Sequence, residues 1–181
     1  GWPVMALGGG RFDPQRFAQD CEKNSWLESC SAYERIGAGR DDASRALLSQ
    51  DLRDPRVRAV VSFDLGLARG LDPASLSNFP VPTLIVGAGP HSKELSSAME
   101  SGHMAKLMPT TTTQAMVIED AGHFSFLQRC KPGGMDILEK EEPGDSMICA
   151  DGGGRDRVAI HQQVVQAVTD FLRGAGLRAP L

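Results

Sequence analysis

The sequence contains no apolar run approaching the roughly 20 residues needed to cross a bilayer, which excludes a membrane span. It shows no signal peptide, but it opens at Gly1 rather than at methionine, so this absence says nothing about the compartment. It also lacks a basic stripe. Its net charge is −4 with acids and bases interspersed, which argues against a nucleic-acid partner. No internal repeat is visible.

A metal centre has little support in the sequence, because there is no Cys-x-x-Cys motif. The four histidines show no ligand spacing near the cysteines: His91, His103, His123 and His161. We therefore expect neither a metal nor another cofactor.

The 181 residues are enough for one domain with a real core, which we expect to cover 1–181. The four cysteines form two local groups, Cys21 with Cys30 and Cys130 with Cys149. Such pairs are compatible with two disulfides in an oxidising compartment, and equally with four reduced thiols. Paired cysteines favour a periplasmic or secreted location.

Helix signals occur at both ends of the chain. Residues 2–8 predict a short helix, and a second begins at Pro14 with Asp13 as its N-cap. Residues 21–54 are polar and irregular, with a possible helix around 41–51. The clearest helix follows Asp156, and Gly174 can close its end. It has one apolar face: Ile160, Val164, Ala167, Val168 and Phe171.

Three short apolar runs predict buried strands, at 57–63, 80–88 and 115–119, with a helix-compatible segment at 93–107. Short buried strands that alternate with helices indicate a parallel α/β sheet of about three strands flanked by helices. An open edge at the first strand would need a cover from upstream or from another chain. Residues 131–155, rich in glycine and acids, predict a long loop.

Two chemically capable side chains follow predicted strands. His123 comes shortly after the third strand, and Asp64 ends the first. In parallel sheets, ligands bind at the carboxyl ends of the strands. A histidine there acts as a general base if a carboxylate holds its other ring nitrogen. The alternative for His123 is a histidine that caps a strand or lies at the surface. The alternative for Asp64 is an aspartate that only forms a turn. Glu94 is the runner-up acid, although a place in the first turn of a helix also explains it.

These residues carry a family resemblance. The chain resembles the C-terminal portion of dienelactone-hydrolase-like α/β-hydrolases, a group that is similar to platelet-activating-factor acetylhydrolases. The matching segments run in order through Gly1-Trp2, 10–13, 54–64, 81–86, 121–126, Cys130, Cys149 and Asp156-Arg157. Most specific is Ala-Gly-His-Phe-Ser-Phe with its following cysteine.

The resemblance implies a Ser-Asp-His triad with Asp64 as the acid and His123 as the base. No Gly-x-Ser-x-Gly elbow occurs in the sequence, and Ser62 and Ser125 lack its flanking glycines. The resemblance therefore implies that the serine, the oxyanion-hole donors and the N-terminal half of the domain precede Gly1.

The implied activity is hydrolysis of a small-molecule carboxylic ester or lactone. Leu65 and Phe124 are candidate substrate-binding residues, although core packing explains them equally well. The alternative readings are a catalytically inactive hydrolase-like binding domain and a fragment without independent function.

Overall fold

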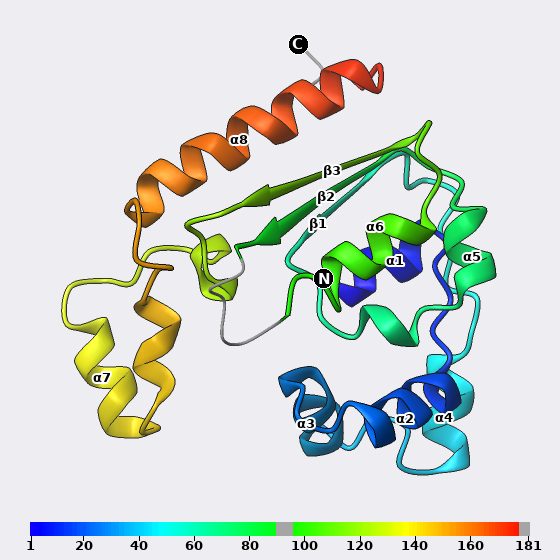
Figure 1. The fold of residues 1–181 in the computed structure, drawn as a ribbon, viewed down its shortest axis with the longest axis horizontal. Helices are drawn as coiled ribbons and strands as arrows, with labels where there is room; N and C mark the ends of the chain where they lie inside the picture. The colour runs from blue at the N-terminus through cyan, green and yellow to red at the C-terminus, as the bar shows by residue number, and fades with distance from the viewer. Residues whose placement is uncertain (90–95, 178–181) are drawn as a thin grey trace. The chain divides into compact units, whose positions relative to one another are not determined.

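The computed structural model describes residues 1–89 and 96–177 and has an α/β architecture. Three strands, β1 (Val60–Phe63), β2 (Thr83–Ala88) and β3 (Thr113–Ile118), form a parallel sheet in the order β1-β2-β3 (Figure 1). The β1–β2 register pairs Val60 with Thr83 and Phe63 with Val86. This sheet confirms the predicted fold class.

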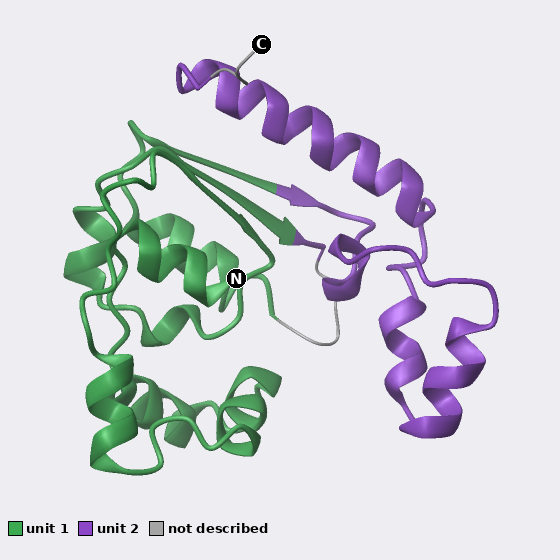
Figure 2. Ribbon diagram, turned by 180° about the vertical axis from the view of Figure 1, so that it is seen from behind, with its two compact units in different colours: residues 1–87, 95–116 green, residues 88–94, 117–181 purple. Residues whose placement is uncertain are grey.

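The chain divides into two compact units, shown in Figure 2. Unit 1 contains residues 1–87 and 95–116, and unit 2 contains residues 88–94 and 117–181. The sequence suggested a single domain over 1–181.

Unit 1 carries most of the helices, and their starts follow local signals in the sequence. Pro3 occupies the first turn of α1 (Trp2–Gly8), and Gly9, at φ 118°, closes that helix in the left-handed region. Asp13 caps α2 by accepting a hydrogen bond from the Arg16 N–H at 3.0 Å. The helices are α1, α2 (Pro14–Lys23), α3 (Glu28–Arg35), α4 (Asp42–Leu48), α5 (Pro73–Ser77) and α6 (Ser101–Leu107).

The core of unit 1 is built around aromatic side chains. Phe12 meets Trp2 edge-on with ring centroids 5.7 Å apart, and Phe17 meets Tyr33 in the same way at 4.9 Å. Phe17 is fully buried. Burying a phenylalanine side chain of this kind contributes about 1.5–3 kcal/mol to stability. These contacts join α1 and α2 to α3, a helix that the composition of residues 21–54 did not indicate.

Unit 2 holds the 3-10 helix η2 (His123–Phe126), α7 (Gly134–Glu141), the 3-10 helix η3 (Asp145–Cys149) and α8 (Arg157–Gly174). Asp156 caps α8 as predicted, accepting from the Ala159 N–H at 2.9 Å. The helix ends at Gly174, where the sequence predicted its end, but the left-handed glycine that follows the C-cap Ala175 is Gly176, at φ 72°.

Two further expectations change in detail. Residues 131–155, expected to be one long loop, contain α7 and η3. The segment 93–107 is helical over α6, while residues 90–95 lie outside the described part of the chain.

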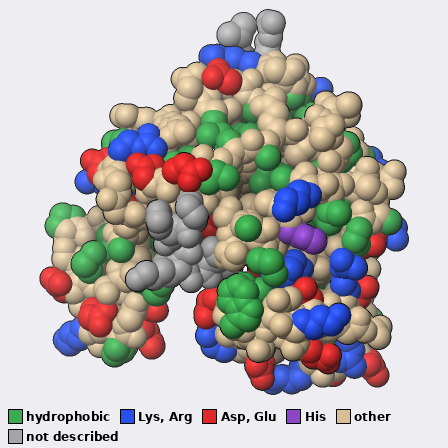
Figure 3. Space-filling view, in the orientation of Figure 1, with side chains coloured by type: hydrophobic (Ala, Val, Ile, Leu, Met, Phe, Trp, Pro, Cys, Tyr) green, Lys and Arg blue, Asp and Glu red, His purple; other side chains and the backbone are tan. Residues whose placement is uncertain are grey.

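Among the described residues, no helix combines the length and apolar character required to span a bilayer. Figure 3 shows acidic and basic side chains interspersed on one face, as the composition suggested.

Both predicted disulfides are present. Cys21 bonds to Cys30 and ties α2 to α3, while Cys130 bonds to Cys149 and closes the segment that contains α7. The cysteine pairs are therefore bridged, and the alternative of four reduced thiols is wrong for this structure.

Candidate functional site

Asp64, the predicted acid, lies immediately after β1 and is almost entirely buried, with 1% of its surface exposed. Its N–H donates to the Val86 carbonyl at 2.7 Å, which fixes its backbone beside the end of β2. Its φ of 37° places it in the left-handed region, where non-glycine residues are uncommon. Leu67, at φ 64°, repeats this three residues later, so the loop after β1 holds two unusual backbone conformations.

Leu65, a candidate substrate-binding residue, is 2% exposed and belongs to the hydrophobic core of unit 1. It packs directly against the start of the chain. A Cβ atom added at Gly1 would lie 2.5 Å from Leu65 Cδ1 and 3.3 Å from its Cα. Gly1 therefore lies close to Leu65, in the loop that carries Asp64.

His123, the predicted base, begins η2 shortly after β3 and is half-buried. The neighbouring Phe124, the second candidate substrate-binding residue, is also half-buried. Its ring meets the His123 ring edge to face, with centroids 5.1 Å apart. This contact restricts the orientation of the imidazole within unit 2.

The turn that carries His123 is closed by the buried Ser125. Its hydroxyl accepts a hydrogen bond from the Gly122 N–H at 3.1 Å and donates one to Asp151 Oδ1 at 2.9 Å. Its carbonyl accepts from His161 Nε2 at 2.9 Å, so that nitrogen carries the hydrogen. Ser125 is thus committed to supporting the turn, which adds to the reasons against its acting as a nucleophile.

Arg157 connects this turn to the rest of unit 2. Its guanidinium is 4% exposed and donates from Nε to Asp151 Oδ1 at 2.9 Å. Nη1 donates to the Gln128 carbonyl at 3.1 Å, and Nη2 to the Ile148 and Ala150 carbonyls at 2.9 Å each. One side chain therefore joins the segment just before Cys130 to the segment around Cys149.

A more exposed ion pair lies just before the histidine turn. The Arg155 guanidinium binds both carboxylate oxygens of Asp120 at 2.7 Å, and the Arg155 N–H adds a contact at 3.0 Å. These hydrogen bonds hold the pKa of Asp120 far below its usual range, and the pKa of Arg155 is raised in return. This ion pair holds Asp120, which lies three residues before η2, against Arg155.

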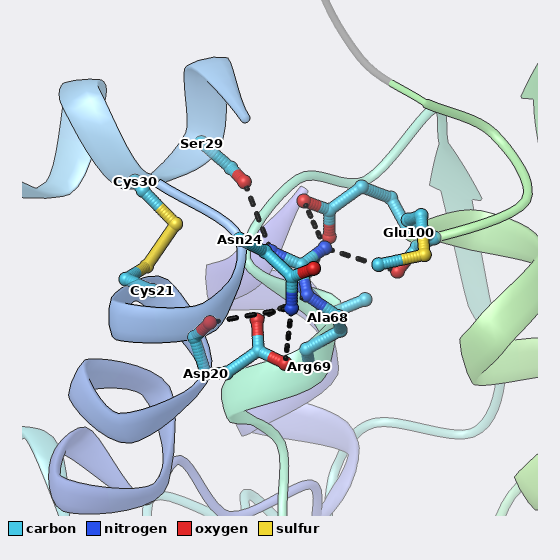
Figure 4. The surroundings of a disulfide bond; sticks show 9 residues. Asp20, Cys21, Asn24, Ser29, Cys30, Ala68, Arg69 and Glu100 are labelled. Atoms are coloured by element: carbon cyan, nitrogen blue, oxygen red, sulfur yellow. Dashed lines mark hydrogen bonds and ion pairs between the residues drawn. A yellow bond between two sulfur atoms is a disulfide. The ribbon is translucent and has the colours of Figure 1, made fainter. Parts of the chain in front are cut away.

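A second polar cluster is buried in unit 1, beside the Cys21–Cys30 disulfide (Figure 4). Arg69, 4% exposed, pairs with Asp20 and with Glu100, whose Oε1 lies 3.0 Å from Nη1. Glu100 Oε2 accepts from the Ala68 N–H at 2.8 Å. Burial raises the pKa of Glu100 despite these favourable contacts. The cluster braces unit 1 and was not anticipated from the sequence.

The structure assigns the predicted acid to unit 1 and the predicted base to unit 2. A proton bridge between Asp64 and His123 therefore stays a prediction. Glu94, the runner-up acid, lies outside the described residues. Among the residues that are described, no group of histidine, cysteine or carboxylate side chains could hold a metal ion.

From the sequence, Asp151 was not singled out, His161 was considered only as a possible metal ligand, and Arg157 was noted solely as part of a family match. Their roles depend on contacts to backbone carbonyls and to Ser125, which leave no motif. Comparisons with protein-family models, with curated proteins and with solved structures find no match to this chain. The chemistry therefore has to be argued from the residues themselves.

Proposed function

We propose that this chain supplies the acid and the base of a Ser-Asp-His hydrolase acting on a small-molecule carboxylic ester or lactone. Asp64 is the acid and His123 the base. The observation that carries the proposal is a buried aspartate, in an unusual backbone conformation, directly after a strand of a parallel sheet whose last strand leads to the histidine.

Strand topology supports this pairing. Asp64 follows β1 and His123 follows β3, and the sheet order is β1-β2-β3. The carboxyl ends of parallel strands lie at the same edge of a sheet, where doubly wound folds bind their ligands. Acid before histidine is also the chain order of α/β-hydrolase triads.

The serine and the rest of the domain's N-terminal half are proposed to precede Gly1. The contact between Gly1 and Leu65 supports this arrangement, because a residue preceding Gly1 would join the chain beside the acid's loop. An oxyanion hole would come from the same upstream part, since the nucleophile elbow and an earlier loop supply its donors in this fold.

The proposed reaction transfers an acyl group to water in two steps. His123 takes the serine proton as the serine oxygen bonds to the ester carbonyl carbon, and it returns that proton to the leaving alcohol. In the second step His123 takes a proton from water as the water oxygen bonds to the acyl carbon, and it returns that proton to the serine oxygen as the acid product leaves. Asp64 accepts the histidine N–H and stabilises the imidazolium.

The two disulfides support a working location outside the cytosol, because such bonds persist in oxidising compartments. We propose a periplasmic or secreted enzyme. Its ester substrate would then be a compound that this protein meets outside the cytosol.

The test uses the full-length protein, including the residues before Gly1, assayed on short-chain p-nitrophenyl esters. His123→Ala is expected to lower kcat by at least 10³-fold, because the serine loses its base. A fluorophosphonate probe, which reacts with activated serines, should label one serine upstream of Gly1. Peptide mass mapping would identify that residue.

His103→Ala is the matched control, because it removes a histidine of unit 1 that follows neither β1 nor β3. Its turnover should equal that of the unchanged protein. Undiminished ester turnover in His123→Ala would refute the proposed base. A full-length protein that neither turns over esters nor reacts with the probe would favour the inactive binding domain instead.

A further inference from the structure

Unit 2 contains a pocket that the proposed triad does not use. Its volume is about 830 Å³, within the range of about 300–1,000 Å³ that is typical of small-molecule sites. One wall comes from the chain that leaves η2, with Phe126 and Leu127, and another from Ile137 and Leu138 of α7. Ile148 of η3 completes the apolar lining.

Two of these apolar side chains are poorly protected from water. Ile137 is 62% exposed and Leu127 is 48% exposed, although both line a concavity. An apolar chain that filled the pocket would remove this surface from water, which favours binding in proportion to the apolar area covered. The lining therefore favours a hydrocarbon ligand over a polar one.

Two of the segments that line this pocket, the chain after η2 and the end of η3, are held together before any ligand arrives. The Cys130–Cys149 disulfide joins the segment after η2 to the end of η3. Arg157 bonds the same two segments through the carbonyls of Gln128 and Ile148. Because these two segments are cross-linked, binding has to order less of the pocket lining, and small-molecule sites are usually largely pre-formed.

The charged side chains that line the pocket are cationic. Arg129 and Lys131 are among its lining residues, and the described lining contains no aspartate or glutamate. A guanidinium matches the planar geometry of a carboxylate and binds it through two parallel hydrogen bonds. An apolar cavity with cationic residues in its wall is complementary to a hydrocarbon chain that ends in a carboxylate.

We propose that this pocket binds a medium- or long-chain carboxylate. The ligand enters as a single dissolved molecule and not as part of a micelle. The apolar chain lies against Leu127, Ile137 and Ile148, and the carboxylate pairs with Arg129 and Lys131. The inference goes beyond the proposed hydrolase and does not depend on it, because it needs neither Asp64 nor a serine.

The test is calorimetric titration of the oxidised protein, in the same full-length form as the ester assay, with dodecanoate below its micelle concentration. We expect saturable binding with one site. Decanoate should bind more weakly by about fourfold for each methylene group lost. Dodecanol, which has no charge, should bind about tenfold more weakly than dodecanoate, as expected for the loss of charge-assisted hydrogen bonds. Arg129→Ala combined with Lys131→Ala should abolish this preference for the carboxylate.

Ile137→Glu should weaken dodecanoate binding at least tenfold, because it places a like charge in the pocket. Leu127→Glu tests the opposite wall, and both sites are exposed enough for the fold to persist. Ile36→Glu is the matched control, since that isoleucine is 71% exposed in unit 1.

Absence of saturable binding, or equal losses in Ile36→Glu and Ile137→Glu, would overturn the proposal. Dimerisation of the chain in sedimentation that Ile137→Glu abolishes would also overturn it, because a second copy would then be the occupant. Undiminished binding by His123→Ala would confirm that this site and the proposed triad are separate.

Discussion

Asp151 Oδ1 accepts two hydrogen bonds of 2.9 Å, one from Arg157 Nε and one from the hydroxyl of Ser125. Ser125 lies two residues after His123, in the same 3-10 turn. The ion pair between the buried Arg157 and the partly buried Asp151 is therefore one hydrogen bond away from the backbone that positions the proposed base. Stability of unit 2 and orientation of His123 depend on the same side chains.

Removing the arginine of this pair should destabilise the protein strongly. Arg157→Leu would leave three backbone carbonyls without the guanidinium donor and Asp151 without its ion-pair partner, with the Ser125 hydroxyl still donating to Asp151. Breaking a buried ion pair by deleting one partner costs about 3 kcal/mol. Urea unfolding followed by circular dichroism measures this loss as a lower midpoint at unchanged slope.

Arg155→Leu provides the matched control for that measurement. Arg155 makes a two-pronged ion pair with Asp120, but its side chain is 46% exposed and water can replace its contacts. Arg155→Leu should therefore lower the free energy of unfolding clearly less than Arg157→Leu does. Equal losses for the two variants would contradict the central role assigned to Arg157.

The buried Glu100 should give stability a pH dependence of unusual sign. Because burial raises its folded-state pKa above the ordinary 4.5, the unfolded chain releases this proton more readily. The stability that Glu100 contributes is present below pH 4.5 and is lost as pH rises through the raised pKa. The free energy of unfolding of the unchanged protein minus that of Glu100→Gln should therefore fall as pH rises.

Glu139→Gln is the control with the opposite expectation. Hydrogen bonds from Ser146 and Gly144 lower the pKa of Glu139, so its contribution is present above pH 4.5 and is lost on acidification. Urea midpoints measured from about pH 2 to pH 8 cover both the acidic range in which the Glu139 contribution is lost and the higher range in which the Glu100 contribution is lost. A Glu100→Gln difference that stayed flat or rose with pH would show that burial does not govern this carboxyl group.

The sequence predicted best those features whose physical cause is local. Asp13 and Asp156 cap their helices because each side chain reaches an N–H three residues ahead. The strands were recognisable because each lies between turn residues and carries apolar side chains, as in the fully buried β2. The cysteine pairs were found because each pair is close in sequence.

Features that depend on distant backbone could not be predicted in this way. Helix α3 begins after Leu27, which has no side-chain acceptor to signal a start, and α7 begins after Gly133 in a glycine-rich stretch. Arg157 finds its partners at carbonyls of other segments, and carbonyls carry no residue identity. For the same reason, Asp64 and His123 were identified as residues, while the proton bridge between them stays a prediction.

Both disulfides should contribute to stability, and the Cys130–Cys149 bond should contribute more. It closes a segment with a sequence separation of 19, against 9 for Cys21–Cys30. The entropy removed from the unfolded chain grows with loop length, and a loop of this size gives about 3 kcal/mol. Cys130→Ser with Cys149→Ser should lower the urea midpoint more than Cys21→Ser with Cys30→Ser. The reverse order would indicate that the buried Arg69 cluster relies on the Cys21–Cys30 bond.

Substitution of Asp64 separates its chemical role from its conformational one. Asn has nearly the same shape and tolerates the left-handed backbone, whereas Ala at φ 37° adds a conformational cost of about 1–2 kcal/mol. In the full-length protein, Asp64→Asn and Asp64→Ala should both reduce ester kcat by about 10⁴-fold, as expected for loss of a triad acid. Urea unfolding should place the midpoint of Asp64→Asn above that of Asp64→Ala. If Asp64→Asn kept full turnover at unchanged stability, the buried aspartate would serve the β1 turn alone, and the acid of the proposed triad would have to be sought elsewhere.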